Sequence, residues 1–146
     1  MASSGSDNGL PIVLVTNDDG STAPGLLALA DVLILGGKCQ VFVCAPDQER
    51  SGVSHSITSG ENLLEAGPVG VAKGILGYEV SGSPADCVSL ALTSDMFPWK
   101  VAPALVLSGI NKGCSIGYHM FYSGTVAGAR EAVIHGVPAM AISLHW

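Results

Sequence analysis

The sequence predicts an α/β fold of three layers, in which a parallel sheet carries helices on both faces. Short runs rich in valine and isoleucine alternate with segments of helical periodicity, and each run ends at polar and glycine residues. The 146 residues, 48% of them hydrophobic, suffice for one domain with a sizeable core. We expect residues 10–146 to form that domain and residues 1–9, which are small and polar, to form a flexible tail.

The first third of the chain predicts a strand, a helix and a second strand. Residues 10–16 are almost entirely apolar, which is typical of a strand buried on both faces. Pro24-Gly25 then opens a helix of regularly spaced leucines, and Gly36-Gly37 suits a left-handed helix end. Residues 41–45 form the second strand. Such strand–helix–strand units are nearly always right-handed parallel crossovers.

The middle of the chain has a weaker pattern. Residues 48–55 are polar and contain glycine, so we expect a loop at the end of the second strand. Residues 56–80 show short alternating pieces broken by glycines, which favours a peripheral antiparallel ribbon. Ser83, with Pro84 after it and Asp86 in the first turn, indicates a helix that runs to about residue 95.

The last third repeats the alternation. Residues 104–107 predict a third buried parallel strand, and residues 108–113 a polar, glycine-containing loop after it. The segment 123–125 leads into a helix over 126–134, and residues 139–144 predict the last strand.

Composition restricts the functional class. The formal charge of −6 and the low isoelectric point argue against polymeric nucleic acid as a partner, although a small phosphorylated ligand is compatible if a metal supplies positive charge. The four cysteines have no Cys-x-x-Cys spacing, so we expect free thiols and a reducing compartment. Neither a signal peptide nor a run long enough to cross a bilayer is visible, so we expect a cytoplasmic protein without membrane association.

The polar segments that follow the strands are expected to meet. In an open parallel sheet, the loops that leave the carboxyl ends of the strands emerge at one edge, where ligands bind. Asp18-Asp19, the 46–55 loop, residues 108–115 and Ser123-Gly124-Thr125 should all lie there. Two adjacent carboxylates beside a buried strand need a cation, a basic partner or exposure in a turn.

The side chains on this edge form a set of oxygen ligands. The set comprises Asp18, Asp19, Ser51, Ser54 and Asn111, which suits Mg²⁺ or Mn²⁺ better than structural zinc. The alternative is that Asp18-Asp19 belongs to a solvated turn.

A second polar segment of this edge suits an anion. Ser123-Gly124-Thr125 at a helix start suits a phosphate, the alternative being an ordinary N-cap. The histidines at 55, 119 and 135 repeat no metal-binding spacing, so we expect them to satisfy local hydrogen bonds and assign them no catalytic role.

Five segments together resemble the SurE family of survival-protein nucleotidases, and the wording around 117–130 is similar to its plant members. The segments are Val15-Thr16-Asn17-Asp18-Asp19-Gly20 with Ala23-Pro24-Gly25, Ala45-Pro46-Asp47 with Arg50-Ser51-Gly52, Gly82-Ser83-Pro84-Ala85-Asp86-Cys87-Val88, Ser108-Gly109-Ile110-Asn111, and Tyr122-Ser123-Gly124-Thr125-Val126-Ala127. They span nearly the whole chain in the order of the family.

The resemblance implies a Rossmann-like sheet and a metal-dependent hydrolase of phosphomonoesters, of the 5'-nucleotidase or acid phosphatase type. Its substrates would be nucleoside 5'- or 3'-monophosphates. The resemblance implies that a divalent ion, Mg²⁺ or Mn²⁺, is held by Asp18, Asp19, Ser51 and Asn111. Asp18 or Asp19 would transfer the proton, and our choice is Asp18.

The resemblance also implies a set of residues near the substrate, and the sequence departs from the family in two ways. The substrate set is Asn17, Gly52, Ser115, Ser123, Gly124 and Thr125. Ser115 stands where the family usually has asparagine. Family members also continue well beyond residue 146 with an arm exchanged between subunits, so the family's homodimer does not carry over directly. The alternative function is a weakly active or inactive nucleotide- or metal-binding fragment of the same fold.

Overall fold

The computed structural model describes residues 9–71 and 74–145, so the expected tail lies, apart from residue 9, outside the described residues. The elements in chain order are β1 (Ile12–Thr16), α1 (Pro24–Gly36), β2 (Gln40–Pro46), β3 (Ala66–Pro68), β4 (Leu76–Val80), α2 (Pro84–Thr93), β5 (Leu105–Lys112), the 3-10 helix η1 (Gly117–Phe121), α3 (Gly124–Ile134) and β6 (Ala139–Leu144).

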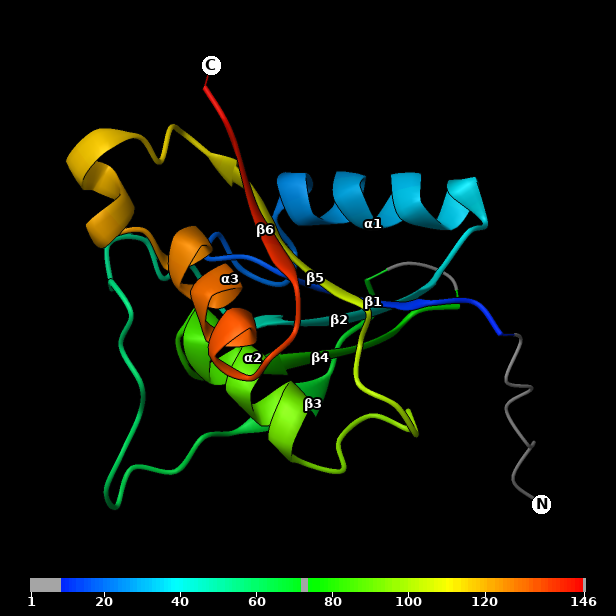
Figure 1. Ribbon diagram of the computed structural model, residues 1–146. Coiled ribbons are helices and arrows are strands. Elements are labelled where there is room, and N and C mark those ends of the chain that lie inside the picture. The colour runs from blue at the N-terminus through cyan, green and yellow to red at the C-terminus, as the bar shows by residue number, and fades with distance from the viewer. Residues whose placement is uncertain (1–8, 72–73, 146) are drawn as a thin grey trace.

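A six-stranded sheet in the order β3-β4-β2-β1-β5-β6 forms the middle layer. Helix α1 covers one face, and α2 and α3 pack side by side on the other (Figure 1). All neighbouring strands are parallel except β3 and β4. The predicted α/β fold with helices on both faces is therefore confirmed, with one antiparallel edge strand added.

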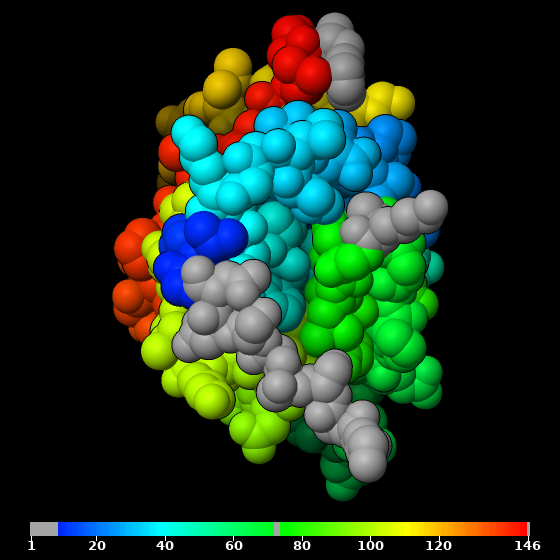
Figure 2. Space-filling view, turned by 90° about the vertical axis from the view of Figure 1, so that its right-hand side faces the viewer, coloured from blue at the N-terminus to red at the C-terminus, as the bar shows by residue number. Residues whose placement is uncertain are grey.

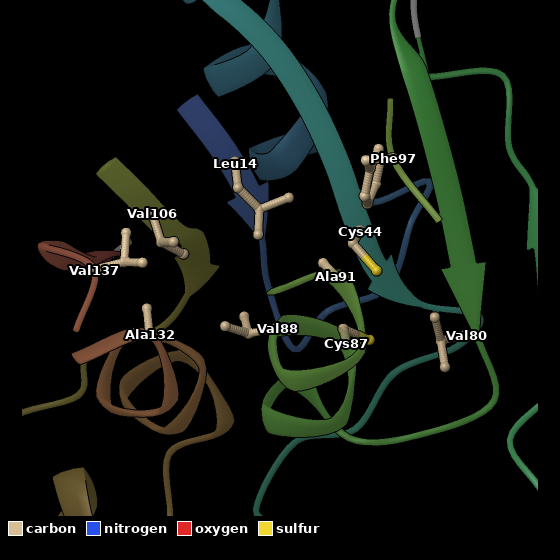
Figure 3. Packing of buried hydrophobic residues seen from close by; sticks show 10 residues of the cluster. All are labelled: Leu14, Cys44, Val80, Cys87, Val88, Ala91, Phe97, Val106, Ala132 and Val137. Carbon is tan, nitrogen blue, oxygen red and sulfur yellow. The ribbon is translucent and has the colours of Figure 1, made fainter. Parts of the chain in front are cut away.

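Strand β1 is central, because it pairs with β2 on one side and β5 on the other. Its side chains alternate between two hydrophobic clusters. Leu14 points toward α2 and α3, where it packs in one cluster with Val88 and Ala132 (Figure 3). Val13 and Val15 belong to the cluster under α1. Burial on both faces explains why β1 reads as a continuous apolar run rather than as an alternating one.

Helix α1 lies on the surface of the molecule, where Figure 2 shows it in blue and cyan. It buries Leu26 and Ala30 against the sheet, while Val32 and Leu35 on its outer side are exposed. It ends at Gly37, which has the predicted left-handed conformation (φ 61°).

Helix α2 begins with the capping box that Ser83 and Asp86 predict. The Ser83 hydroxyl accepts a hydrogen bond from the Asp86 N–H (3.1 Å), and the Asp86 carboxylate accepts one from the Ser83 N–H (2.8 Å). The same carboxylate accepts two more hydrogen bonds at 2.8 Å, from the N–H and the hydroxyl of Thr58. Asp86 therefore ties the long connection after β2 to the start of α2.

The prediction for residues 56–80 was wrong in its second half. An antiparallel pair, β3 with β4, is present, but β4 also pairs in parallel with β2 over five residues. It is thus an integral strand of the main sheet rather than part of a peripheral ribbon. The glycines at 74 and 77 interrupt the apolar pattern, and only two of its residues, Gly77 and Val80, are buried.

The prediction that residues 108–112 form a loop was also wrong, because β5 continues to Lys112. A register shift opposite β6, between Ser108 and Asn111, allows the strand to continue. Gly109 has φ 144° there, and a Cβ on it would collide with the carbonyl oxygen of Ile142. A glycine inside a strand looks like a break in the sequence, which is why the prediction ended the strand early. The 3-10 helix η1 was not predicted.

Two further findings concern the chain as a whole. All four cysteines are free, as predicted. Over the residues that the structure describes, no helix has the length and apolar character needed to cross a membrane.

We predict that Asp86→Ala lowers the free energy of unfolding by about 2–4 kcal/mol, because it removes a helix cap and leaves buried donors unpaired. Urea denaturation measures this change. As a control, Asp95→Ala, at an exposed position after the same helix, should change stability by less than about 0.5 kcal/mol. Equal denaturation midpoints for the two variants would contradict the anchoring role of Asp86.

Candidate active site

A cavity of about 340 Å³ opens at the carboxyl ends of β1, β2 and β5, beside the start of α3. All four segments that were expected to converge contribute to its wall, through Asp18, Ser51, Gly52, Asn111, Lys112, Gly113, Cys114, Ser115 and Ser123, and His119 and Tyr122 complete it. A second cavity, of about 450 Å³, contains Asp19 in its wall, and Ser51 and Lys112 line both cavities. The two carboxylates therefore border adjoining spaces that share Ser51.

Asp18 is the most buried carboxylate of the site, with 3% of its surface exposed. Its Oδ1 accepts a hydrogen bond from the Thr125 hydroxyl at 2.6 Å, and its carbonyl oxygen accepts one from the Arg50 N–H at 2.7 Å. A Cβ on Gly124 would lie 2.7 Å from the Cβ of Asp18. The start of α3 thus packs directly on Asp18, and only glycine fits at position 124.

Burial raises the pKa of Asp18 above its ordinary value. The hydrogen bond from Thr125 opposes this shift, and the neighbouring charge of Asp19 adds to it. Among the described residues, no lysine, arginine or histidine forms an ion pair with Asp18. A buried carboxylate beside a second carboxylate, without a basic partner, is an environment that a bound cation would stabilise.

Asp19 lies at the edge of the second cavity and is only partly buried. Its Oδ2 accepts a hydrogen bond from the backbone N–H of Lys112 at 3.0 Å, which links the turn after β1 to the end of β5. The extension of β5 to Lys112 is therefore what places this donor opposite Asp19.

The two remaining predicted metal ligands, Asn111 and Ser51, also line the first cavity. Asn111 donates from Nδ2 to the carbonyl oxygen of Gly113 (2.9 Å), which leaves Oδ1 without a hydrogen bond to any described residue. The Ser51 hydroxyl donates to Glu49 (2.9 Å), so its lone pairs are free to coordinate. The described residues contain no group of three or more His, Cys, Asp and Glu side chains that would hold a metal. The candidate set thus depends on its serine and amide oxygens as well as on its two carboxylates.

The loop that carries Ser51 is fixed on both sides. Before it, the Arg50 N–H bonds to Asp18 as described above. After it, the Ser54 N–H donates to the carbonyl oxygen of Tyr122 at 3.0 Å. Ser54, which the sequence included among the oxygen ligands, does not line either cavity.

Three of the predicted substrate-binding residues line the first cavity: Gly52, Ser115 and Ser123. The hydroxyls of Ser115 and Ser123 are 3.1 Å apart, and Ser123 also caps α3 by accepting from the Val126 N–H. Ser123 is therefore both an N-cap and a residue of the cavity wall. The two interpretations of this segment do not exclude each other.

The other three predicted substrate-binding residues do not line the cavity but stand behind it. Asn17 is fully buried, and its Nδ2 donates to the carbonyl oxygen of Gly20 (2.9 Å), which fixes the turn that holds both aspartates. Gly124 and Thr125 pack against Asp18. These three residues therefore hold Asp18 and Asp19 in position rather than border the cavity themselves.

His119 lines the first cavity, although we assigned it no catalytic role from the sequence. By contrast, the other two histidines considered have the local partners that the sequence led us to expect: His55 and His135 contact the buried Glu131 at 2.7 and 3.0 Å. The one feature of the sequence that could have placed His119 at the cavity is its position in the chain. It lies between Asn111 and Ser123, which both border the cavity, so the connection between them cannot run far from it.

Residues 13–146 match the sequence profile of the family described as "Survival protein SurE". The chain belongs to the SurE family. This assignment confirms the resemblance seen in the sequence.

The SurE relatives extend well beyond the matched region. Proteins named "5'-nucleotidase SurE" from two strains of Desulfitobacterium hafniense are 48% identical over 136 residues, which is 90% of this chain and 50% of theirs. The protein of that name from Carboxydothermus hydrogenoformans is 46% identical over 132 residues, 90% of this chain and 49% of its own. The chain thus spans about half the length of these curated SurE relatives.

A solved SurE structure shares the fold. The crystal structure of the SurE protein from Aquifex aeolicus matches with a TM-score of 0.74 and 41% sequence identity, covering 91% of this chain and 50% of that one. The α/β, Rossmann-like fold is therefore the fold of the family.

We predict that Asp18→Asn stabilises the metal-free chain at neutral pH by about 0.5–2 kcal/mol, because it removes a buried charge while keeping an acceptor for Thr125. The direction in which stability changes with pH follows from the difference between the pKa of Asp18 in the folded and in the unfolded chain. Since the pKa of Asp18 is raised in the folded chain, wild-type stability falls as pH rises from the ordinary pKa of an aspartate, 3.8, through the raised pKa of Asp18. Thermal unfolding in EDTA across this range measures the effect. A less stable variant at pH 7 would contradict it.

We also predict that Gly124→Ala destabilises the chain by about 1–3 kcal/mol, because the new methyl group would displace Asp18. Gly36→Ala is the matched control: it is also a helical glycine, but no atom lies within 4 Å of its added Cβ, so stability should be unchanged or slightly higher. Chemical denaturation of both variants measures the difference. Equal changes in stability for the two variants would contradict the prediction, because they would show that the start of α3 can move away from Asp18 at little cost.

Proposed function

We propose that this chain is a phosphomonoester hydrolase that acts on nucleoside monophosphates, as a nucleotidase. The observation that supports the proposal most strongly is the setting of Asp18. A buried carboxylate with a raised pKa, without a basic partner, borders the same cavity as Ser51, Asn111 and the start of α3. The SurE relatives from Desulfitobacterium hafniense and Carboxydothermus hydrogenoformans are named 5'-nucleotidases, which agrees with this chemistry.

The proposal includes a divalent cation, Mg²⁺ or Mn²⁺, held by Asp18, Asp19, Ser51 and Asn111. The donors are all oxygen atoms, which such hard cations prefer, and the cation would relieve the buried charge of Asp18. When bound, it would polarise the phosphoryl group and favour deprotonation of water.

The side chains of this chain would do the remaining work. The N-terminus of α3, with Ser123 in the cavity wall, suits the phosphate dianion because the positive end of the helix dipole lies there and the Ser123 hydroxyl can bond to a phosphate oxygen. Lys112 is the one lysine or arginine among the described residues that line the first cavity, and it adds positive charge there. Asp18 is our choice for the group that accepts a proton from the attacking water, because its carboxylate belongs to the residue at the centre of the proposed metal site and borders the cavity in which the water would attack.

The free thiols support a cytoplasmic location as part of the same proposal, since disulfides are rare in that reducing compartment. The position of the phosphate, 5' or 3', and the preferred base are the finer parts of the proposal, and a substrate panel decides them.

We predict that the purified chain releases phosphate from nucleoside monophosphates with Mn²⁺ or Mg²⁺, and that EDTA abolishes this release. Asp19→Asn should lower kcat/KM by about 10²-fold or more while circular dichroism shows an intact fold, because a metal-binding carboxylate is lost. Asp95→Asn, remote from the cavity, should keep the wild-type rate. A panel of 5'- and 3'-monophosphates measures both rate and position. Nucleotide binding without any release would contradict the proposal and indicate the binding fragment instead.

A further inference from the structure

The cavity that contains Asp18 also contains a side chain with the chemistry of a proton donor and no structural partner. We infer that His119 is a catalytic acid, which gives a proton to the leaving oxygen of the phosphate ester. The inference rests on the proposed hydrolysis and adds a residue to it.

The position of His119 is fixed by its backbone, while its ring is free. In η1 the His119 N–H donates to Ile116 (3.2 Å), and its carbonyl oxygen accepts from Tyr122 (3.0 Å). Its imidazole forms no hydrogen bond with any described residue, yet it lines the same cavity as Asp18 and Ser51. A well-placed backbone and an available ring are the geometry that a proton donor needs.

The other histidines on this side of the sheet are engaged elsewhere. His55 lies between Glu131 and Arg130, at 2.7 and 3.3 Å, and His135 contacts the same carboxylate. Neither lines the cavity. Within the described part of the chain, His119 therefore carries the only imidazole in the wall of this cavity.

The chemistry of the reaction calls for such a donor. Water attacks phosphorus, a new phosphorus–oxygen bond forms, and the bond to the nucleoside oxygen breaks with its electron pair on that oxygen. An alkoxide is a poor leaving group, so a proton supplied as the bond breaks lowers the barrier. The proton of the attacking water goes to Asp18 and that of His119 to the nucleoside. Asp18 then releases its proton to solvent, and His119 regains one from solvent. Imidazole suits this step because its ring nitrogens can both donate and accept a proton.

The test compares two esters that differ in their need for this proton. A nucleoside 5'-monophosphate releases an alkoxide, whereas 4-nitrophenyl phosphate releases a stabilised phenolate that leaves without protonation. We expect His119→Gln to lower kcat/KM for the nucleotide by about 10²–10⁴-fold. The rate with 4-nitrophenyl phosphate should stay within about threefold of wild type, because the general-acid step contributes little there.

The matched control is Tyr118→Ala. Tyr118 neighbours His119 in η1, is 82% exposed and does not line the cavity, so its substitution should leave both rates unchanged. His119→Ala serves as a second variant. For each variant, thermal unfolding with and without Mn²⁺ shows whether the fold and the metal site are intact.

The possible outcomes separate this inference from the proposed function. A loss confined to the nucleotide supports His119 as the acid. An equal loss with both esters, or no loss with either, overturns that role while leaving the proposed hydrolysis in place. If the wild-type chain hydrolyses neither ester, the proposed function fails and the inference fails with it.

Discussion

A buried carboxylate at the end of the central strand is the constraint on which the rest of this structure depends. Asp18 lies just beyond β1, which is covered on both faces, and only 3% of its surface is exposed to solvent. Such a group is tolerated only with close hydrogen-bond partners. Thr125 supplies one, which requires α3 to begin directly above the end of β1. The residues on the inner face of α3 allow the helix to lie this close to Asp18.

Small residues make the approach of α3 possible. Gly124 lies against Asp18, and one turn later Gly128 lies over the ends of β1 and β5, where a Cβ would be 3.0 Å from both Thr16 and Ser108. A helix with larger side chains on this face would stand further from the sheet, and Thr125 would not reach Asp18. The helix that covers the core is therefore the same element that sets the electrostatics of the cavity.

The parts of the fold and site that could be predicted from the sequence are those determined by residues that lie close together in the chain. Doubly buried strands such as β1 appear as apolar runs, and the capping box of Ser83 and Asp86 is visible within four residues. The place of β4 in the main sheet and the second half of β5 were not predicted, because Gly77 and Gly109 interrupt the apolar patterns of these strands, although neighbouring strands hold both in place. Likewise, the contact that the Thr125 hydroxyl makes could not be predicted, because its partner, Asp18, lies 107 positions away in the chain.

The loop between β2 and β3 has a further consequence for any ligand of the cavity. Hydrogen bonds from Arg50 to Asp18 and from Ser54 to Tyr122 hold the backbone on either side of Ser51. The backbone around Ser51 therefore loses its conformational entropy when the chain folds, so a ligand does not have to order it on binding. Because a preorganised group loses little entropy on association, contacts made through Ser51 contribute nearly their full strength to affinity.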